Sequence, residues 1–258
     1  MTAIFAAFYG LSAYVLFVVA LLYAIGFVGN IAVPKSIDSG FVGPPGQSLI
    51  IDLVLLALFA IQHSVMAREG FKRWWTRVVP PVIERSTYVM LASAILLVLY
   101  WQWRALPTAI WTVENPFGVA ALHTIFWSGW VLLLLSSFMI SHFELFGLRQ
   151  VFARLLGLVT QDTDFRAPYL YKHVRHPIYL SFLLAFWATP VMTVGHLVFA
   201  LATTGYILIG IQLEERDLIG RFGDQYRRYR EQVGMLLPKL LRRSPAPGQP
   251  STLERDVA

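Results

Sequence analysis

The sequence predicts an all-α, polytopic membrane protein of about six helices. Of its 258 residues 57% are apolar and only 14% are charged, whereas about a quarter of the residues of a soluble domain carry charge. Apolar windows long enough to cross a bilayer recur along the whole chain. They lie at residues 8–28, 49–67, 86–103, 122–140, 178–192 and 195–213.

The last two windows belong to one uncharged stretch of 36 residues, 178–213. As a single helix it would be about 54 Å long, nearly twice the hydrocarbon core of about 30 Å. Pro190 and the polar residues that follow it favour a turn near the middle. We therefore expect a helical hairpin, and only five membrane spans if this hairpin is re-entrant.

The earlier elements follow in order. The first window is predicted to be a retained helix, because no Lys or Arg precedes Lys35 as a signal peptide would require. Residues 34–48 are rich in Gly and Pro and form an outer loop. Alternating aromatic and basic residues between Arg68 and Arg85 indicate a short interfacial helix. Residues 218–233 show helical periodicity and predict an amphipathic helix on the inner surface.

Basic residues predict the orientation. Lys35 and Arg104 are the only basic residues in the connections assigned to one side, and the other nineteen of the twenty-one lie on the opposite side. By the positive-inside rule that side is cytoplasmic, in a bacterial-type inner membrane, and both termini face it. We divide the chain into N-terminal helices (1–143), a cytoplasm-facing region with the hairpin (144–238) and a mobile tail (239–258).

Composition also excludes several functions. The chain has no cysteine, so disulfides, thiolate metal ligands and cysteine nucleophiles are ruled out. It has neither a Walker loop nor a G-x-G-x-x-G fingerprint, and no soluble segment is long enough for a Rossmann domain. The net charge of +6 suits contact with anionic headgroups of a lipid bilayer. We predict no nucleic-acid partner and no metal site, and the sequence specifies no oligomeric state.

Polar residues near the ends of the spans are candidates for function, because such groups are costly at membrane depth. His63 near the end of the second span either makes an interhelical hydrogen bond or lines an active site. After the fourth span, Glu144 and Arg149 are close enough to pair, and His142 either caps the helix or takes part in a site.

Two polar clusters bracket the hairpin. Arg175, His176 and Pro177 precede it, at a predicted helix start whose free N–H groups favour an anion. Glu214 and Glu215 follow it, at a predicted helix exit where acids need a cation. Either the brackets bind a zwitterionic ligand between them, or Arg175 and a glutamate simply neutralise each other.

These brackets carry a family resemblance. The ordered set Arg175-His176-Pro177-x-Tyr179, Glu214-Glu215-x-x-Leu218 and Phe222-Gly223-x-x-Tyr226-x-x-Tyr229-x-x-x-Val233 resembles the C-terminal signature of the isoprenylcysteine carboxyl methyltransferase superfamily. The resemblance implies S-adenosylmethionine as methyl donor, with S-adenosylhomocysteine as product, bound at the cytoplasmic face without a Rossmann fold. The residues that match the superfamily's cofactor contacts are Tyr171, His176, Pro177, Ile178, Tyr179 and Glu214, to which the charges of Arg175 and Glu215 are added.

At one position the sequence departs from the superfamily's pattern. The arginine that contacts substrate near the end of the last span falls on Gly210, which argues against a prenylcysteine carboxylate as substrate. The stretch from Ser141 to Gln150, Gln62-His63-Ser64 and residues 84–88 are instead similar to the bacterial methanethiol S-methyltransferases, whose N-terminal half is nurim-like. That resemblance implies transfer of a methyl group to a small apolar thiol, methanethiol, to give dimethyl sulfide.

A thiol attacks as its thiolate, so a nearby group must accept its proton or stabilise the anion. His142, His173 and His63 are the candidates, with Arg149 as electrostatic support. Alternative acceptors are a prenylcysteine carboxylate or a phospholipid amine, and a membrane scaffold without turnover is the alternative outside enzymes.

Overall fold

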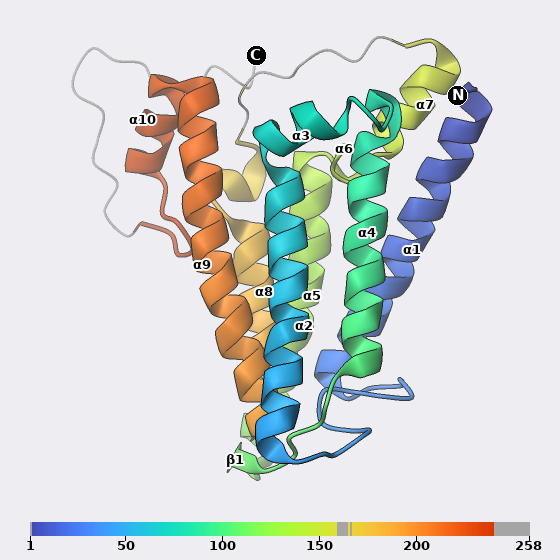
Figure 1. Cartoon of the computed structure of the whole chain (residues 1–258). Coiled ribbons are helices and arrows are strands. Elements are labelled where there is room, and N and C mark those ends of the chain that lie inside the picture. Colours follow the sequence, from blue (N-terminus) through green and yellow to red (C-terminus); the bar gives the residue numbers. More distant parts are fainter. Residues whose placement is uncertain (1, 159–164, 166, 240–258) are drawn as a thin grey trace, which may run out of the picture.

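The computed structural model describes residues 2–158, 165 and 167–239. Five helices in this part of the chain are long and apolar enough to cross a membrane, and they run side by side as one bundle (Figure 1). The all-α membrane fold is therefore confirmed. The five are α1 (Ala3–Gly29), α2 (Pro45–Ala67), α4 (Pro81–Gln102), α5 (Pro116–Ile140) and α9 (Val194–Phe222).

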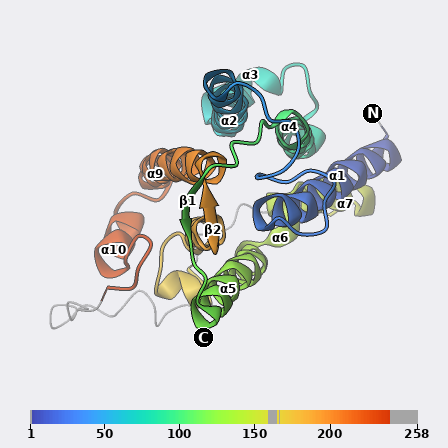
Figure 2. The same ribbon diagram turned by 90° about the horizontal axis from the view of Figure 1, so that it is seen from below.

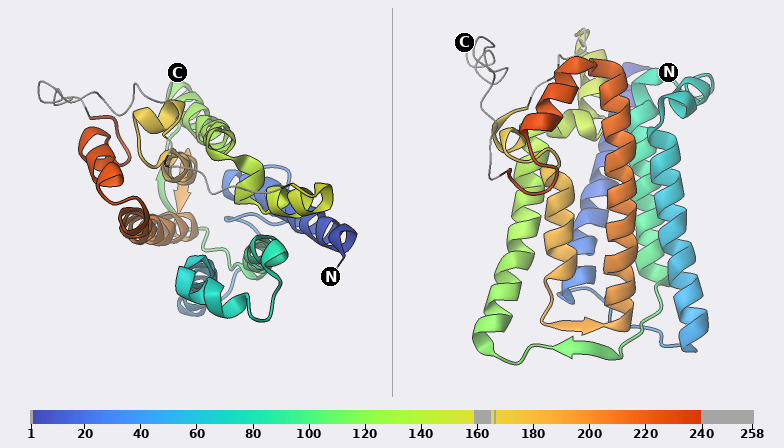
Figure 3. Two further views of the ribbon diagram at one scale, coloured as in Figure 1. Left: turned by 90° about the horizontal axis from the view of Figure 1, so that it is seen from above. Right: turned by 90° about the vertical axis from the view of Figure 1, so that its left-hand side faces the viewer.

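Apart from α8, which lies among the long helices, the shorter elements gather at the two ends of this bundle (Figures 1 and 3). A short helix is present in the predicted region as α3 (Glu69–Trp75), at the same end of the bundle as the start of α1. At the opposite end two short strands pair antiparallel, with Ala109 opposite Thr193, a feature that the sequence analysis did not predict. The remaining elements are α6 (His142–Leu145), α7 (Leu148–Leu156), η1 (Tyr169–Lys172), α8 (Pro177–Trp187), α10 (Asp224–Gln232), β1 (Ala109–Thr112) and β2 (Val191–Thr193).

The hairpin exists, but its first arm is short. Helix α8 has 11 residues, about 16 Å of helix, and is too short to span. The five-span alternative is therefore the correct one. The indole Nε1 of Trp187 donates to Thr204 Oγ1 at 2.9 Å and ties α8 to α9. Because α8 fills only part of the bundle's height, its N-terminus lies between the long helices (Figure 3).

The polar end of the hairpin differs from the prediction in one respect. Helix α9 continues to Phe222, Gly223 adopts a φ of 54° that interrupts the helix, and α10 begins at Asp224. The predicted amphipathic helix over 218–233 is therefore two helices. Glu214 and Glu215 also lie inside α9, two turns before its end, and not at a helix exit.

The core of the bundle is aromatic and lies toward the strand end. Trp103 is completely buried, with its ring 5.7 Å from that of Phe27 and 5.9 Å from that of Phe199. Its Nε1 donates to the carbonyl of Ile37 at 3.0 Å. Within the bundle α1 packs on α4 and α7, α2 packs on α4 and α9, and α5 packs on α8 (Figure 2). The polar clusters lie in the other half of the bundle.

Close packing of α8 on α5 depends on Gly129. A Cβ at this position would lie 2.8 Å from the backbone N of Ala185 and 2.8 Å from the carbonyl O of Ser181, closer than real contacts. We expect Gly129→Ala to lower the apparent melting temperature in detergent, since overpacking costs about 1–3 kcal/mol. Gly205→Ala in α9 is the matched control, because its Cβ would meet nothing within 4 Å. Equal melting temperatures for the two variants would contradict this packing.

Candidate active site

The hairpin brings the two predicted brackets into contact. Arg175 Nε donates to Glu215 Oε1 at 2.8 Å, and His176 Nε2 lies 3.1 Å from the same oxygen. The Arg175 and Glu215 side chains are only 8% and 10% exposed, and that of His176 is 4% exposed. Of the two readings that the sequence left open, mutual neutralisation is realised between Arg175 and Glu215. The ion pair joins the segment before α8 to the C-terminal part of α9.

A third segment, after α10, closes against this pair. The backbone N–H of Arg175 donates to the carbonyl of Gly234 at 2.9 Å, and that of His176 donates to Met235 at 3.1 Å. The Arg175 guanidinium also donates to the carbonyls of Arg230, at 3.0 Å, and Val233. Arg175 therefore clamps the C-terminal segment onto the start of α8, a contact that the sequence analysis did not predict.

Glu214 points elsewhere. Adjacent residues of a helix are about 100° apart, and Glu214 accepts a hydrogen bond of 2.9 Å from the hydroxyl of Tyr179 on α8. A Cβ built on Gly210, one turn earlier, would lie 3.8 Å from the same hydroxyl. Tyr206, Gly210 and Glu214 are spaced four residues apart and share one face of α9. This face of α9 is turned toward the hydroxyl of Tyr179 on α8.

The remaining predicted cofactor residues surround the start of α8. Tyr171 in η1 is buried, its hydroxyl lies 3.4 Å from the carbonyl of Ser136, and its own carbonyl accepts a hydrogen bond from Tyr229. Burial raises the pKa of both tyrosines, so both hydroxyls stay protonated at physiological pH. Pro177 is fully buried as the first residue of α8, and Ile178 packs against the apolar core.

This arrangement fits S-adenosylmethionine, the methyl donor that the resemblance implies. The first N–H groups of α8, at Ile178 and Tyr179, have no acceptor within the helix and suit a carboxylate. The Glu214 carboxylate would supply negative charge for its ammonium or sulfonium group. Ser136 Oγ is buried and has no hydrogen-bond partner among the described residues, so a polar group is available beside Tyr171.

Of the predicted proton acceptors, His63 packs against helix α9. Its Nε2 is 2.7 Å from the hydroxyl of Tyr88 on α4, so the interhelical hydrogen bond is confirmed. Its ring also lies 6.4 Å from that of Tyr206, on the α9 face that leads to Glu214. Tyr88 and Tyr206 were not among the predicted site residues, because the contact depends on how three separate helices pack.

The other candidates lie in α6, in α7 and at the end of η1. Both ring nitrogens of His142 have partners, the hydroxyl of Tyr14 at 2.8 Å and that of Ser137 at 2.9 Å. Burial lowers the pKa of His142, so the ring is neutral near pH 7. The predicted pair of Arg149 and Glu144 forms, but it is half-exposed and belongs to α6 and α7, which continue toward α1 (Figure 3). His173 is exposed at the end of η1.

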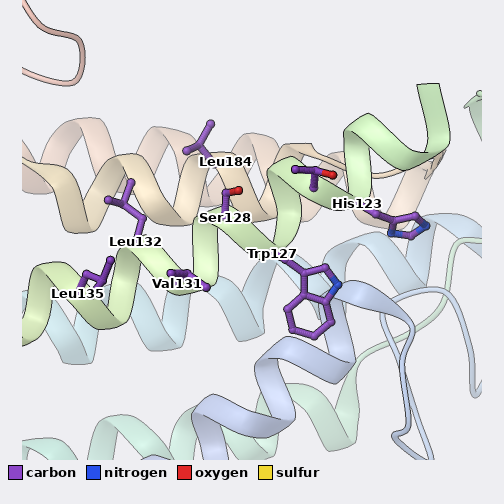
Figure 4. Close-up of a pocket in the computed structure, with 8 residues that line it drawn as sticks. His123, Trp127, Ser128, Val131, Leu132, Leu135 and Leu184 are labelled. Atoms are coloured by element: carbon purple, nitrogen blue, oxygen red, sulfur yellow. The ribbon is translucent and has the colours of Figure 1, made fainter. Parts of the chain in front are cut away.

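A groove of about 660 Å³ lies outside this site, along the outward face of α5. Figure 4 shows that α5 supplies nearly all of its lining and that α8 adds Leu184. It contains none of the predicted site residues. The lining residues are His123, Thr124, Trp127, Ser128, Val131, Leu132, Leu135 and Leu184.

Comparison with known proteins gives close relatives over most of the chain. A methanethiol S-methyltransferase of Mycobacterium tuberculosis is 59% identical over 230 residues, which are 89% of this chain and 94% of the relative. Methanethiol S-methyltransferase 1 of Bradyrhizobium diazoefficiens is 58% identical, over 89% of this chain and 81% of the relative. Nurim of Mus musculus is 36% identical over 66% of this chain and 68% of that protein. No family model and no solved structure matches the chain.

Proposed function

Because the chain belongs to the methanethiol S-methyltransferase family, we propose that it methylates methanethiol to dimethyl sulfide with S-adenosylmethionine as the methyl donor. The identity of 59% over nearly the whole length of a relative with that activity in its name carries this proposal. The juxtaposition of Glu214, Tyr179 and the start of α8 supports it, because these groups suit a zwitterionic sulfonium. Gly210 disfavours a prenylcysteine carboxylate, since it supplies no cation beside Tyr179.

The protein's main contribution to such a reaction is alignment and exclusion of water. Methyl transfer is an in-line displacement, and positioning alone can supply several kcal/mol of the barrier reduction. S-Adenosylmethionine, when bound, supplies an activated methyl group. The hydroxyl of Tyr179 orients the Glu214 carboxylate at 2.9 Å. Arg175, Glu215 and the C-terminal segment hold the start of α8 in place.

We place this site at the cytoplasmic face of an inner membrane. The basic connections lie at the end of the bundle where α1 starts and where α3, α7 and α10 lie (Figure 1). This end then faces the supply of S-adenosylmethionine. An apolar thiol partitions into the bilayer and reaches the inner half of the bundle from there.

Calorimetry with S-adenosylhomocysteine tests the cofactor site. We expect the purified wild type to bind it, and Glu214→Ala to weaken binding roughly tenfold to hundredfold, the range for a hydrogen bond to a charged group. Glu231→Ala on α10 is the control, because this glutamate is exposed and outside the site. Unaltered binding by Glu214→Ala would remove Glu214 from the cofactor site. Absence of dimethyl sulfide in the headspace over the wild type supplied with methanethiol would contradict the reaction.

A further inference from the structure

Four rings from three helices form a box beside Glu214 and Tyr179. The His63 ring lies 5.2 Å from that of Phe59 and 5.0 Å from that of Tyr88. The Tyr206 ring closes the box at 6.2 Å from Phe59 and 6.4 Å from His63. Phe59 and His63 lie on α2, Tyr88 on α4 and Tyr206 on α9. Aromatic walls of this kind suit a small, polarisable sulfur compound.

The box also contains an unused hydrogen-bonding atom. A hydroxyl buried between helices needs an acceptor, and His63 Nε2 lies 2.7 Å from the hydroxyl of Tyr88. When Tyr88 donates, Nε2 is unprotonated and the neutral ring carries its proton on Nδ1. His63 Nδ1 is buried and has no hydrogen-bond partner among the described residues. An unsatisfied buried donor is costly, so this N–H is suited to an acceptor that the protein itself does not supply.

The positive charge of Arg85 lies beside this box of rings. The guanidinium of Arg85 lies over the Tyr88 ring, 5.0 Å from its centroid, and donates to the carbonyl of Leu145 at 2.7 Å. Arg85 acts electrostatically on His63 as well as on Tyr88. The charged and titratable groups that face the box from the surrounding elements are Arg85 and Glu84 on α4, Tyr206 on α9, and Arg68 at the end of α2, which pairs with Asp217 of α9 at 2.6 Å.

The box lies next to the proposed donor site. Tyr206, Gly210 and Glu214 share one face of α9, and the hydroxyl of Tyr179 reaches that face at both Gly210 and Glu214. Tyr88 and Tyr206 are both close enough to Tyr179 to interact with it electrostatically. A ligand in the box would therefore lie beside a donor held by Glu214.

We propose that Phe59, His63, Tyr88 and Tyr206 form the acceptor pocket, in which the Nδ1–H of His63 holds methanethiol as its thiolate. The inference rests on the proposed function. The thiol loses its proton to cytoplasmic water, and the hydrogen bond from His63 stabilises the resulting thiolate. A lone pair of the thiolate sulfur then attacks the methyl carbon and forms the new carbon–sulfur bond. The electron pair of the broken methyl–sulfur bond stays on the donor's sulfur. On this account the N-terminal helices supply the acceptor pocket and the hairpin supplies the donor site.

Two variants test the pocket. His63→Phe removes the Nδ1–H but keeps an aromatic ring, and Tyr88→Phe removes the hydroxyl that fixes the tautomer. We expect His63→Phe to lower kcat/KM for methanethiol roughly tenfold to hundredfold, as for a lost hydrogen bond to an anion. Tyr88→Phe should lower it less, and both variants should bind S-adenosylhomocysteine like the wild type. The controls are His123→Phe on the outward face of α5 and Tyr23→Phe, whose hydroxyl donates to the carbonyl of Lys35.

The number of protons released on thiol binding shows whether His63 stabilises a bound thiolate or has only a structural role. Methanethiol is titrated calorimetrically, in buffers of different ionisation enthalpy, into protein loaded with sinefungin, a donor analogue that transfers no methyl group. We expect the wild type and both controls to release a proton on binding the thiol, and His63→Phe to release less. The kcat of His63→Phe at saturating methanethiol should also continue to rise at alkaline pH values where that of the wild type has levelled off, because kcat reports the pKa of the bound thiol.

The outcomes distinguish the pocket from the function. If the wild type makes dimethyl sulfide but His63→Phe releases as many protons as the wild type, the pocket is wrong and the function stands. A parallel loss of S-adenosylhomocysteine affinity in His63→Phe would likewise overturn the pocket, because it would make His63 part of the donor site or the general fold. A wild type that makes no dimethyl sulfide contradicts the function, and the thiol pocket with it.

Discussion

Glu215→Ala is expected to destabilise the protein strongly. Its carboxylate pairs with Arg175 at 2.8 Å and with His176 at 3.1 Å, and the side chains of the ion pair are at most 10% exposed. Removing one partner of a buried pair leaves the other charge uncompensated, at a cost of about 3–5 kcal/mol. We expect a large fall in the apparent melting temperature and loss of S-adenosylhomocysteine binding, measured by thermal denaturation in detergent and by calorimetry.

Two comparisons make this result specific. Asp224→Ala removes an exposed pair with Arg227, and exposed pairs contribute little, so its melting temperature should equal that of the wild type. The double variant Arg175→Met/Glu215→Leu should recover stability, because it leaves no unpaired charge. It should not recover cofactor binding, since the contacts of Arg175 with the C-terminal segment are lost as well. If Glu215→Ala were as stable as Asp224→Ala, the buried clamp would be refuted.

Gly234→Ala is expected to detach the C-terminal segment from the start of α8. A Cβ on Gly234 would lie 1.8 Å from the carbonyl O of Leu237, so the turn that follows must open. The carbonyls of Gly234 and Met235 would then lose the N–H groups of Arg175 and His176. Two backbone hydrogen bonds contribute about 2 kcal/mol, which corresponds to roughly thirtyfold weaker binding of S-adenosylhomocysteine.

Gly220→Ala is the control for this substitution. Gly220 lies in α9 and its Cβ would meet nothing within 4 Å, so the variant should bind S-adenosylhomocysteine like the wild type. Calorimetry on the two proteins, with thermal denaturation as a check on folding, measures the difference. Equal affinities would mean that the segment after α10 does not support the cofactor site.

Much of the fold followed from hydropathy alone. The windows that predicted α1, α2, α4, α5 and α9 are long and apolar. Within a bilayer, a helix lets such a segment satisfy its own backbone N–H and C=O groups. The end of helix α8 was harder to predict, because a short apolar run is compatible with either a helix or a strand. Its window extended to residue 192, but the helix ends at Trp187 and the chain pairs with β1 instead.

Site residues were predictable where they are close in sequence, or where the hairpin brings the segments before and after it together. Arg175, His176 and Glu215 were identified in this way. Which glutamate pairs with Arg175 depends on the rotation of α9, and composition does not specify it. The ring box of His63 and Tyr206 depends on the packing of α2, α4 and α9. His142 has the same residue type and similar polar neighbours, yet its partners lie on α1 and α5.

The measurement closest to the central claim follows the methyl group itself. Purified protein in lipid vesicles is given methanethiol and S-adenosylmethionine with a trideuterated methyl group, and the headspace gas is analysed by mass spectrometry. We predict dimethyl sulfide that carries one trideuterated methyl group, formed by the wild type and by Glu231→Ala but greatly reduced with Glu214→Ala. Unlabelled dimethyl sulfide, no dimethyl sulfide, or equal labelled product from Glu214→Ala would contradict methyl transfer at this site.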